Sequence, residues 1–361
     1  MSLILQCIYM ASVSPVLKKE HTSQHYRANV SESSWSQRLY APTFITKIDD
    51  VYLLVDSWHH RVIYNTNLDA PVGKWRSLLA DGPIWIPHSV ANNGEVMLVE
   101  SSDHGSSGSN HSLIVYRIVR KVPGKVERFT FVQRLQLCAG KSVFRPHRIQ
   151  YDSNTDAFYV YITGPPTLGK YRWSTKDQKL YHVYCEDLSF MEGAYARSFT
   201  IINDVFVFIA GPRSSLTFAR LEGVNGTPRY TGRAKLGWLG IKSRSMNDVV
   251  YMDNYWYISS TYPCSLLRVK SLKRGPVEML HKRLNLCRAR AQGPGVLAGG
   301  RCNLLGTPYY SSFVDGKMMI PFLFHCSGVL SYDPVNGSST VLWGSGWTEA
   351  PEDVKRRGTE W

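Results

Sequence analysis

Residues 42–64, PTFITKIDDVYLLVDSWHHRVIY, set out a structural unit that recurs along the chain. The unit has three runs rich in β-branched and aromatic residues. The pair Asp49-Asp50 separates the first two runs, and a polar segment from Ser57 to His60 precedes the third. Because Asp and Asn accept a positive φ at low cost, such pairs between β-rich runs predict tight hairpins. The unit therefore predicts three successive antiparallel strands.

Five further stretches repeat the first two runs of this unit. Their second runs read EVMLVE, AFYVYI, VFVFIA, YWYISS and KMMIPF, and turn residues (Asn, Asp or Gly) precede each of them. One position near the start of each first run serves as the anchor of its unit. The anchors are Thr43, His88, His147, Arg197, Asn247 and Tyr309.

Spacings of 45, 59, 50, 50 and 62 residues separate the anchors. Each spacing has room for about four short strands of ordinary length. Units of four antiparallel strands repeated around an axis form a β-propeller, which hides its sheet edges by closing on itself. The predicted fold class is therefore all-β, a six-bladed β-propeller of four-stranded antiparallel blades.

The repeats also predict the limits of the folded part. The propeller is expected over residues 39–343, with an N-terminal extension at 1–38 and a C-terminal tail at 344–361. Residues 24–40 are a candidate closing strand. The chain shows no long 3.6-residue apolar pattern, and its best candidate for a helix is a short one near Leu280 to Cys287.

Composition excludes some classes of protein. Of the 361 residues, 43% are hydrophobic and only 19% are charged, which excludes a disordered chain. No run approaches the ~18 apolar residues of a membrane-spanning helix. Lys and Arg outnumber Asp and Glu by 42 to 28, so we expect an anionic partner: nucleic acid, a membrane surface or an acidic glycan. The first eleven residues lack a basic region and make a poor signal peptide. The sequence leaves the compartment open, and it does not indicate an oligomeric state.

Seven cysteines are present, and no two have the Cys-x-x-Cys spacing of a zinc ribbon. We expect them to be mainly buried free thiols. In an oxidising compartment one pair, such as Cys287 with Cys302, could form a disulfide.

A family resemblance rests on the first unit. The segment Val55 to Val62, VDSWHHRV, resembles the core of the NHL repeat, with His59 where Asn is usual. The starts Pro87-His88-Ser89-Val90 and Pro146-His147-Arg148-Ile149 resemble strand starts in the same six-bladed clan. That clan includes the senescence-marker/gluconolactonase proteins, the paraoxonases and the peptidyl-hydroxyglycine amidating lyases. The resemblance implies the propeller fold but no particular activity, because propellers host many functions.

The anchors predict a binding site at one mouth of the central channel, where the innermost strands begin. A ring of polar groups in a concave mouth is a typical ligand site, although the same groups could merely hydrate the channel and join the blades. Our leading hypothesis is a binding protein for an anionic small molecule or an acidic glycan. Its expected ligand contacts are Thr43, His88, His147, Arg197, Asn247, Asp248 and Tyr309.

A second hypothesis is an enzyme, either a polysaccharide lyase or a hydrolase. An Arg that neutralises a carboxylate beside a His or Tyr that moves protons suits abstraction of the proton α to that carboxylate. The candidate catalytic residues are His88, His147, Tyr195, Arg197 and Tyr309. Gly-x-Ser-x-Gly, the Walker loop and a strand–GxGxxG–helix unit are all absent from the sequence.

No cofactor is expected, but a divalent metal is a further alternative. His88 and His147 come from adjacent blades and could share a zinc ion, as the resemblance to the amidating lyases implies. Asn247 and Asp248 resemble the strand start of the calcium-dependent members of the clan.

A third hypothesis is a protein- or RNA-binding scaffold that uses basic clusters on the outer rim. These clusters are Arg117/Arg120/Lys121/Lys125/Arg128, Arg268/Lys270/Lys273/Arg274, Lys282/Arg283/Arg288/Arg290 and Lys355/Arg356/Arg357.

Overall fold

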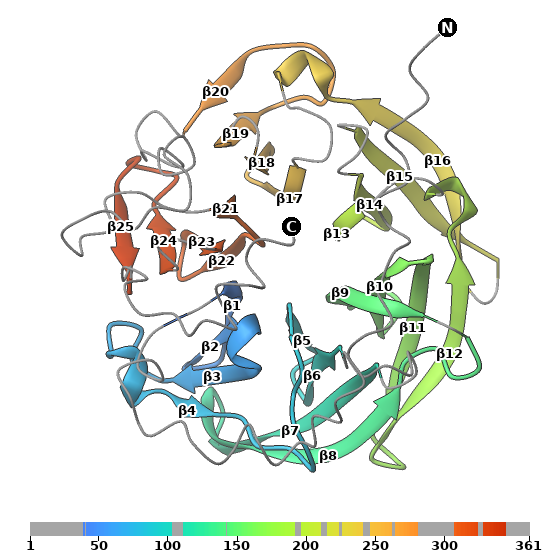
Figure 1. Cartoon of the computed structure of the whole chain (residues 1–361), viewed down its shortest axis with the longest axis vertical. Helices are drawn as coiled ribbons and strands as arrows, with labels where there is room; N and C mark the ends of the chain where they lie inside the picture. Colours follow the sequence, from blue (N-terminus) through green and yellow to red (C-terminus); the bar gives the residue numbers. More distant parts are fainter. Residues whose placement is uncertain are drawn as a thin grey trace, which may run out of the picture.

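A computed structural model describes residues 39, 41–102, 111–141, 143–191, 196–210, 215–223, 226–240, 246–261, 264–280, 307–323 and 328–343. Their strands form six antiparallel sheets arranged in a ring around a central axis (Figure 1). Each sheet uses strands that are consecutive in the chain. The predicted six-bladed β-propeller is confirmed.

The first three blades follow the strand order expected from the repeats. Blade 1 holds β1 (Pro42–Ile48), β2 (Val51–Asp56), β3 (Arg61–Asn65) and β4 (Arg76–Ser77). Blade 2 holds β5 (Val90–Asn92), β6 (Val96–Ser101), β7 (Ser112–Val122) and β8 (Lys125–Gln136). Blade 3 holds β9 (Phe144–Asp152), β10 (Ala157–Gly164), β11 (Pro166–Ser174) and β12 (Lys179–Asp187).

The last three blades complete the ring. Blade 4 holds β13 (Ala196–Ile202), β14 (Val205–Ala210), β15 (Ser215–Glu222) and β16 (Thr227–Lys235). Blade 5 holds β17 (Met246–Met252), β18 (Tyr255–Thr261), β19 (Cys264–Val269) and β20 (Val277–Met279). Blade 6 holds β21 (Thr307–Pro308), β22 (Ser312–Val314), β23 (Lys317–Leu323), β24 (Gly328–Tyr332) and β25 (Ser339–Leu342).

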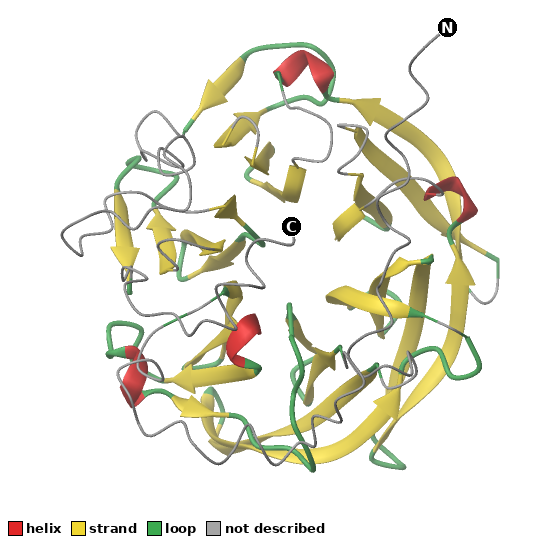
Figure 2. Cartoon of the chain, in the orientation of Figure 1, coloured by secondary structure: helices red, strands yellow, loops and turns green. Residues whose placement is uncertain are grey.

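Helical structure in the described residues is limited to short 3-10 turns between strands (Figure 2). They are η1 (Ser57–His59), η2 (Val72–Lys74), η3 (Ser189–Met191) and η5 (Gly237–Leu239). None of this helical structure is long and apolar enough to cross a membrane. The helix expected near Cys287 lies outside the described residues, except for its first position.

The predicted turn residues form the hairpins between the first and second strands. In blade 4 Asn203 and Asp204 have φ values of 46° and 63°, and in blade 5 Asp253 and Asn254 have 51° and 62°. Two successive positive φ values are typical of the type I′ turn, which matches the right-handed twist of the strands. Local sequence therefore determines where each innermost hairpin turns.

Apolar clusters between neighbouring blades form the core. Between blades 3 and 4, for example, the rings of Phe199, Phe206 and Phe208 are fully buried and contact Tyr159 and Tyr161. Every sheet has neighbours on both faces, so its second strand is apolar in nearly every position. This explains runs such as VFVFIA, which do not alternate between polar and apolar residues.

Blades 1 and 6 join to close the ring. The indole N–H groups of Trp75 and Trp343 both donate to the backbone carbonyl of Ala70, each at 3.0 Å. Lys47 of blade 1 forms an ion pair with Asp315 of blade 6 at 2.7 Å. Of the candidate closing strand at 24–40, the structure describes only residue 39.

The innermost strand of blade 6 differs from the prediction. The sequence predicts a strand start at 308–311, but β21 ends at Pro308 and β22 begins at Ser312. The N–H of Tyr309 still donates to the carbonyl of Pro321 on β23, but that of Tyr310 donates to the carbonyl of Thr43 in blade 1. This contact with blade 1 interrupts the strand.

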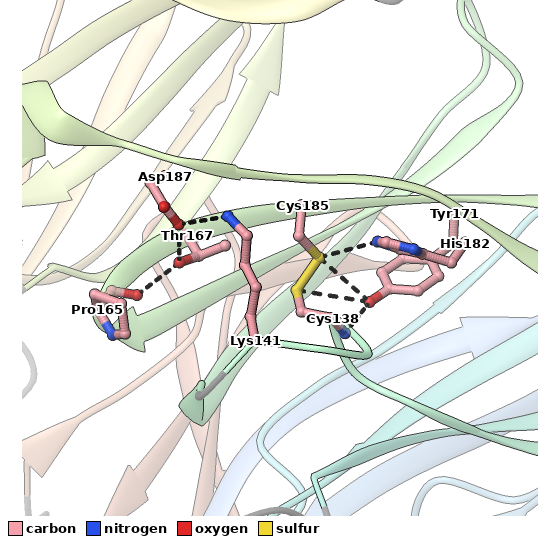
Figure 3. Close-up of polar contacts among 8 residues, drawn as sticks. All are labelled: Cys138, Lys141, Pro165, Thr167, Tyr171, His182, Cys185 and Asp187. Atoms are coloured by element: carbon pink, nitrogen blue, oxygen red, sulfur yellow. Dashed lines mark hydrogen bonds and ion pairs between the residues drawn. A yellow bond between two sulfur atoms is a disulfide. The ribbon is translucent and has the colours of Figure 1, made fainter.

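A disulfide joins Cys138, in the connection from blade 2 to blade 3, to Cys185 on β12 (Figure 3). The expectation of free thiols is wrong for this pair, because the fold brings together two cysteines that lie 47 residues apart. Nε2 of His182 lies 3.2 Å from Sγ of Cys185. Lys141 and Asp187 form an ion pair beside it at 2.9 Å. The proposed partners Cys287 and Cys302 lie outside the described residues.

Candidate functional site

The anchors occupy irregular positions at the start of the innermost strands. On β1, β9, β13 and β17, the pairing with the next strand skips one residue and forms a β-bulge. The skipped residues are the anchors Thr43, His147, Arg197 and Asn247. In blade 2 the anchor His88 precedes β5, and in blade 6 Tyr309 lies between β21 and β22.

A β-bulge turns its extra residue away from the regular alternation of the strand and is common beside functional sites. The sequence predicts the anchors as leading residues of regular strands, and the structure corrects this. Each anchor lies at a point where regular pairing fails. In these four blades the bulge therefore points the anchor side chain in a direction that a regular pleated strand would not allow.

Three ring side chains, from blades 2, 3 and 6, lie close together near the starts of the innermost strands. The ring centroids of His88 and His147 are 4.6 Å apart, and those of His88 and Tyr309 are 6.2 Å apart. The hydroxyl of Tyr309 lies 3.5 Å from Nδ1 of His147. His147 and Tyr309 are buried, whereas His88 is half-buried. The structure thus brings three of the predicted site residues together.

The other anchors connect neighbouring blades. Nη1 of Arg197 donates to Oδ1 of Asn247 at 3.1 Å, and Nδ2 of Asn247 donates to the carbonyl of Pro308 at 2.7 Å. Asn247 is fully buried, and Arg197 is half-buried. Thr43 is also buried, and its carbonyl accepts the N–H of Tyr310. These residues therefore join blades as well as contribute to the mouth.

The hydroxyls of Tyr309 and Tyr310 both lie beside Nδ1 of His147, at 3.5 and 3.3 Å. The hydroxyl of Tyr310 donates its one proton to the carbonyl of Arg197 at 2.6 Å, so toward Nδ1 it can act only as an acceptor. Burial lowers the pKa of His147 well below its usual range, and His88, Arg197 and Arg145 lower it further. His147 is therefore neutral at physiological pH.

A second layer of residues follows the anchors directly in the sequence; we call it the inner ring. Its members are Phe44, Ser89, Arg148, Ser198, Asp248 and Tyr310. The guanidinium carbon of Arg148 lies 4.5 Å from the ring centroid of Phe44 and 4.6 Å from that of Tyr310. Within this layer, the sequence predicts a ligand contact only at Asp248. Adjacency to the anchors was the signal that could have found the others.

Two carboxyl groups are completely buried near Arg148. Oε1 of Glu100 accepts the N–H groups of His88 and Ser89, each at 2.7 Å. Burial raises the pKa of Glu100 to about 8, against the opposing effect of these hydrogen bonds and of Arg148. Burial also raises the pKa of Asp248, whose oxygens accept from Ser198 and from the N–H of Ser311.

Among the described residues, the set of possible metal ligands at His88 and His147 is incomplete. His88 and His147 face one another, but no group of three His, Cys, Asp or Glu side chains gathers there. The oxygens of Asn247 and Asp248 accept hydrogen bonds from Arg197, Ser198 and Ser311. We therefore derive no chemistry through a metal.

The basic clusters on the outer strands are partly neutralised. Arg120 pairs with Asp49, Lys125 with Asp50 and Arg128 with Glu127 around β7 and β8. Arg268 pairs with Glu278 in blade 5. The clusters at 282–290 and 355–357, and the candidate catalytic residue Tyr195, lie outside the described residues.

Comparison with known proteins supports the fold. No family model and no curated protein sequence matches the chain. The periplasmic gluconolactonase PpgL of Pseudomonas aeruginosa matches it with a TM-score of 0.53 at 12% identity, over 84% of this chain and 86% of that one. The chain is a β-propeller. A putative 6-phosphogluconolactonase from Bacteroides fragilis (TM-score 0.51, 11% identity, 84% and 83% covered) and Sqt1 of Saccharomyces cerevisiae (0.51, 10%, 86% and 88%) agree.

These identities are low enough that the matches concern architecture alone. The propeller's resemblance to lactonase-like structures is confirmed at the level of fold.

Proposed function

We propose that this propeller binds an anionic ligand, an acidic sugar or glycan fragment, at the channel mouth formed by the anchors. The observation that supports the proposal is the set of bulges near the starts of the innermost strands, whose extra residues include the cation Arg197 and the neutral polar residues Thr43 and Asn247. The charges of Arg145 and Arg197, from blades 3 and 4, both act on His147. An anion at this mouth would be attracted by these cations and could accept hydrogen bonds from the neighbouring polar groups.

Burial of His147 favours binding over proton transfer. A general base works best when its pKa lies near the operating pH, but the pKa of His147 lies well below its usual range. Protonation of His147 would place a further positive charge beside Arg197 in a buried site. A neutral His147 in contact with Tyr310 therefore suits a fixed part of a binding site.

Calorimetric titration tests the proposal. The probes are trigalacturonate, a hyaluronan tetrasaccharide and sodium glucuronate, with the methyl ester of trigalacturonate as the uncharged control. We expect at least one acid to bind, its affinity to fall with added salt, and the ester to bind about tenfold more weakly or not at all, which is the effect of losing one charge-assisted contact.

A matched pair of variants locates the binding. Arg197→Gln should weaken the acid's affinity, whereas Arg229→Gln, the same change at an exposed position on the outer strand β16, should not. Equal binding of acid and ester, no binding of any acid, or equal effects of the two variants would contradict the proposal.

Elimination from a uronate is the second candidate. It is favoured by the approach of His147, Tyr309 and Arg197, which supplies two proton-carrying groups and a cation in one place. Incubation with oligogalacturonate or hyaluronan, followed by ultraviolet absorbance of the unsaturated product, decides between binding and turnover. Product formation that Tyr309→Phe abolishes would establish the lyase, and stable binding without product would support the binding protein.

A further inference from the structure

Arg148 is a buried cation whose hydrogen-bonding capacity the structure leaves unused. The residue is 6% exposed, and its Nε and Nη1 atoms have no hydrogen-bond partner. A buried donor without a partner costs free energy, and an unpaired buried charge costs more. From these unused donors we infer that Arg148 pairs with a carboxylate of the ligand through the N–H groups of its guanidinium. The inference rests on the proposed function.

Two aromatic rings contact this guanidinium. Its central carbon lies 4.5 Å from the ring centroid of Phe44 in blade 1 and 4.6 Å from that of Tyr310 in blade 6. These cation–π contacts use none of its N–H groups as hydrogen-bond donors. An arginine held in this way has already lost much of its side-chain freedom, so less entropy is lost when an anion binds to its N–H groups.

Neither of the nearby carboxyl groups, Glu100 and Asp248, accepts a hydrogen bond from Arg148. Glu100 accepts its hydrogen bonds from the backbone of His88 and Ser89, and Asp248 accepts from Ser198 and Ser311. Arg148 acts on both acids through electrostatics alone. With a pKa of about 8, Glu100 is mainly protonated at neutral pH and supplies little negative charge. The positive charge of Arg148 is thus incompletely compensated within the protein.

The geometry favours a carboxylate over a phosphate. The edge of a guanidinium presents two parallel donors, which match the two oxygens of a carboxylate. A single negative charge neutralises Arg148, whereas a dianion would leave a net negative charge in a buried site beside Glu100 and Asp248. The hydroxyls of Thr43 and Ser311 are also buried and have no hydrogen-bond partner. In the sequence these residues are the direct neighbours of Phe44 and Tyr310.

Nε and Nη1 are both covered, so a ligand reaches them only after a covering side chain shifts. A spectroscopic signal from Arg148 itself is therefore the most direct test. The Nε–H resonances of the arginines are recorded by NMR in the full-length, nitrogen-15-labelled protein. The signal of Arg148 is identified by its loss in Arg148→Lys.

Trigalacturonate, the hyaluronan tetrasaccharide and glucuronate are then added in turn, with the methyl ester of trigalacturonate as control. We expect an acid that binds to shift the Arg148 Nε–H signal, and the ester to leave it in place. Arg148→Lys keeps the charge but lacks the two-donor edge, so its affinity for that acid should fall at least about tenfold. Arg229→Gln should bind as the wild type does.

The outcomes separate the two proposals. If no acid binds the wild type, the proposed function fails and the role of Arg148 fails with it. If an acid binds but the Arg148 signal does not move, the mouth binds anions and the role assigned to Arg148 is wrong. If Arg148→Lys does not fold, the Arg148 signal is assigned instead from triple-resonance spectra of the wild type, which then give the same answer.

Discussion

Asp56 and Glu100 occupy the same position of neighbouring blades, yet they are buried in different ways. Each ends the second run of its repeat, VYLLVD or EVMLVE, and both are completely buried. Asp56 accepts the N–H of Ala41 at 3.1 Å, and Glu100 accepts the N–H groups of His88 and Ser89. In both blades, the acid at the end of the second strand holds the start of the first strand.

The partners of the two acids differ in charge. Oδ2 of Asp56 accepts from Nε and Nη2 of Arg61 at 3.0 and 2.8 Å, and Nδ1 of His59 lies 2.5 Å from it. Glu100 accepts from neutral donors, the backbone N–H groups of His88 and Ser89 and the hydroxyl of Ser89, and its pKa is raised to about 8. The repeat therefore requires an acceptor at this position, while the local partners decide whether it carries a charge. The acid in blade 2 leaves Arg148 for another anion.

The largest effect expected from this comparison is on stability. Asp56→Asn removes the charge that Arg61 faces and places an amide N–H among donors, so the free energy of unfolding should fall by about 3–5 kcal/mol. Glu100→Gln keeps an acceptor for the two N–H groups and should change it by less than about 1 kcal/mol at neutral pH. Urea unfolding of both variants measures the difference. Equal losses would show that the two acids are buried in the same charge state.

The pH dependence of stability sharpens the comparison. The pKa of Glu100 is about 8 in the folded protein and near its ordinary value of 4.5 in the unfolded chain. Between these values the folded state holds a proton that the unfolded state has released. The free energy of unfolding should therefore fall as pH rises from about 4.5 to about 8 and then level off. Unfolding midpoints across this window should show the trend in the wild type, and Glu100→Gln should reduce it. Identical profiles would contradict a protonated Glu100.

The smallest effect is on binding. Above pH 8 Glu100 acquires a negative charge that acts on Arg148, so the affinity for an acidic ligand should fall by about tenfold, equivalent to about 1.4 kcal/mol. The pKa of His147 is too low for it to titrate in this range, and that of Tyr310 lies well above its usual value. Asp248 has its raised pKa in common with Glu100, so Glu100→Gln is needed as the control. Titration of trigalacturonate from pH 7 to 9 should show the fall in the wild type alone, and an equal fall in the variant would exclude Glu100 as its cause.

Sequence reasoning predicted the blades because each hairpin is specified locally. Turn residues such as Asn203-Asp204 and the apolar runs beside them lie within a dozen positions of one another. The bulge at His147 was not predictable in this way, because it depends on the register between β9 and β10. The stacking of Arg148 needs Phe44 and Tyr310 from opposite ends of the chain, and the disulfide needs cysteines of two different segments. Those contacts exist only once the ring has closed.

A crystal structure of the full chain soaked with an acidic oligosaccharide tests the central claim most directly. The ligand used is trigalacturonate, or the hyaluronan tetrasaccharide if that is the one that binds in solution. The account predicts the ligand at the mouth beside His88 and Arg197, with one carboxylate bound to the guanidinium of Arg148. A ligand bound only to the outer strands, or at the mouth with its carboxylates turned away from the arginines, would contradict it.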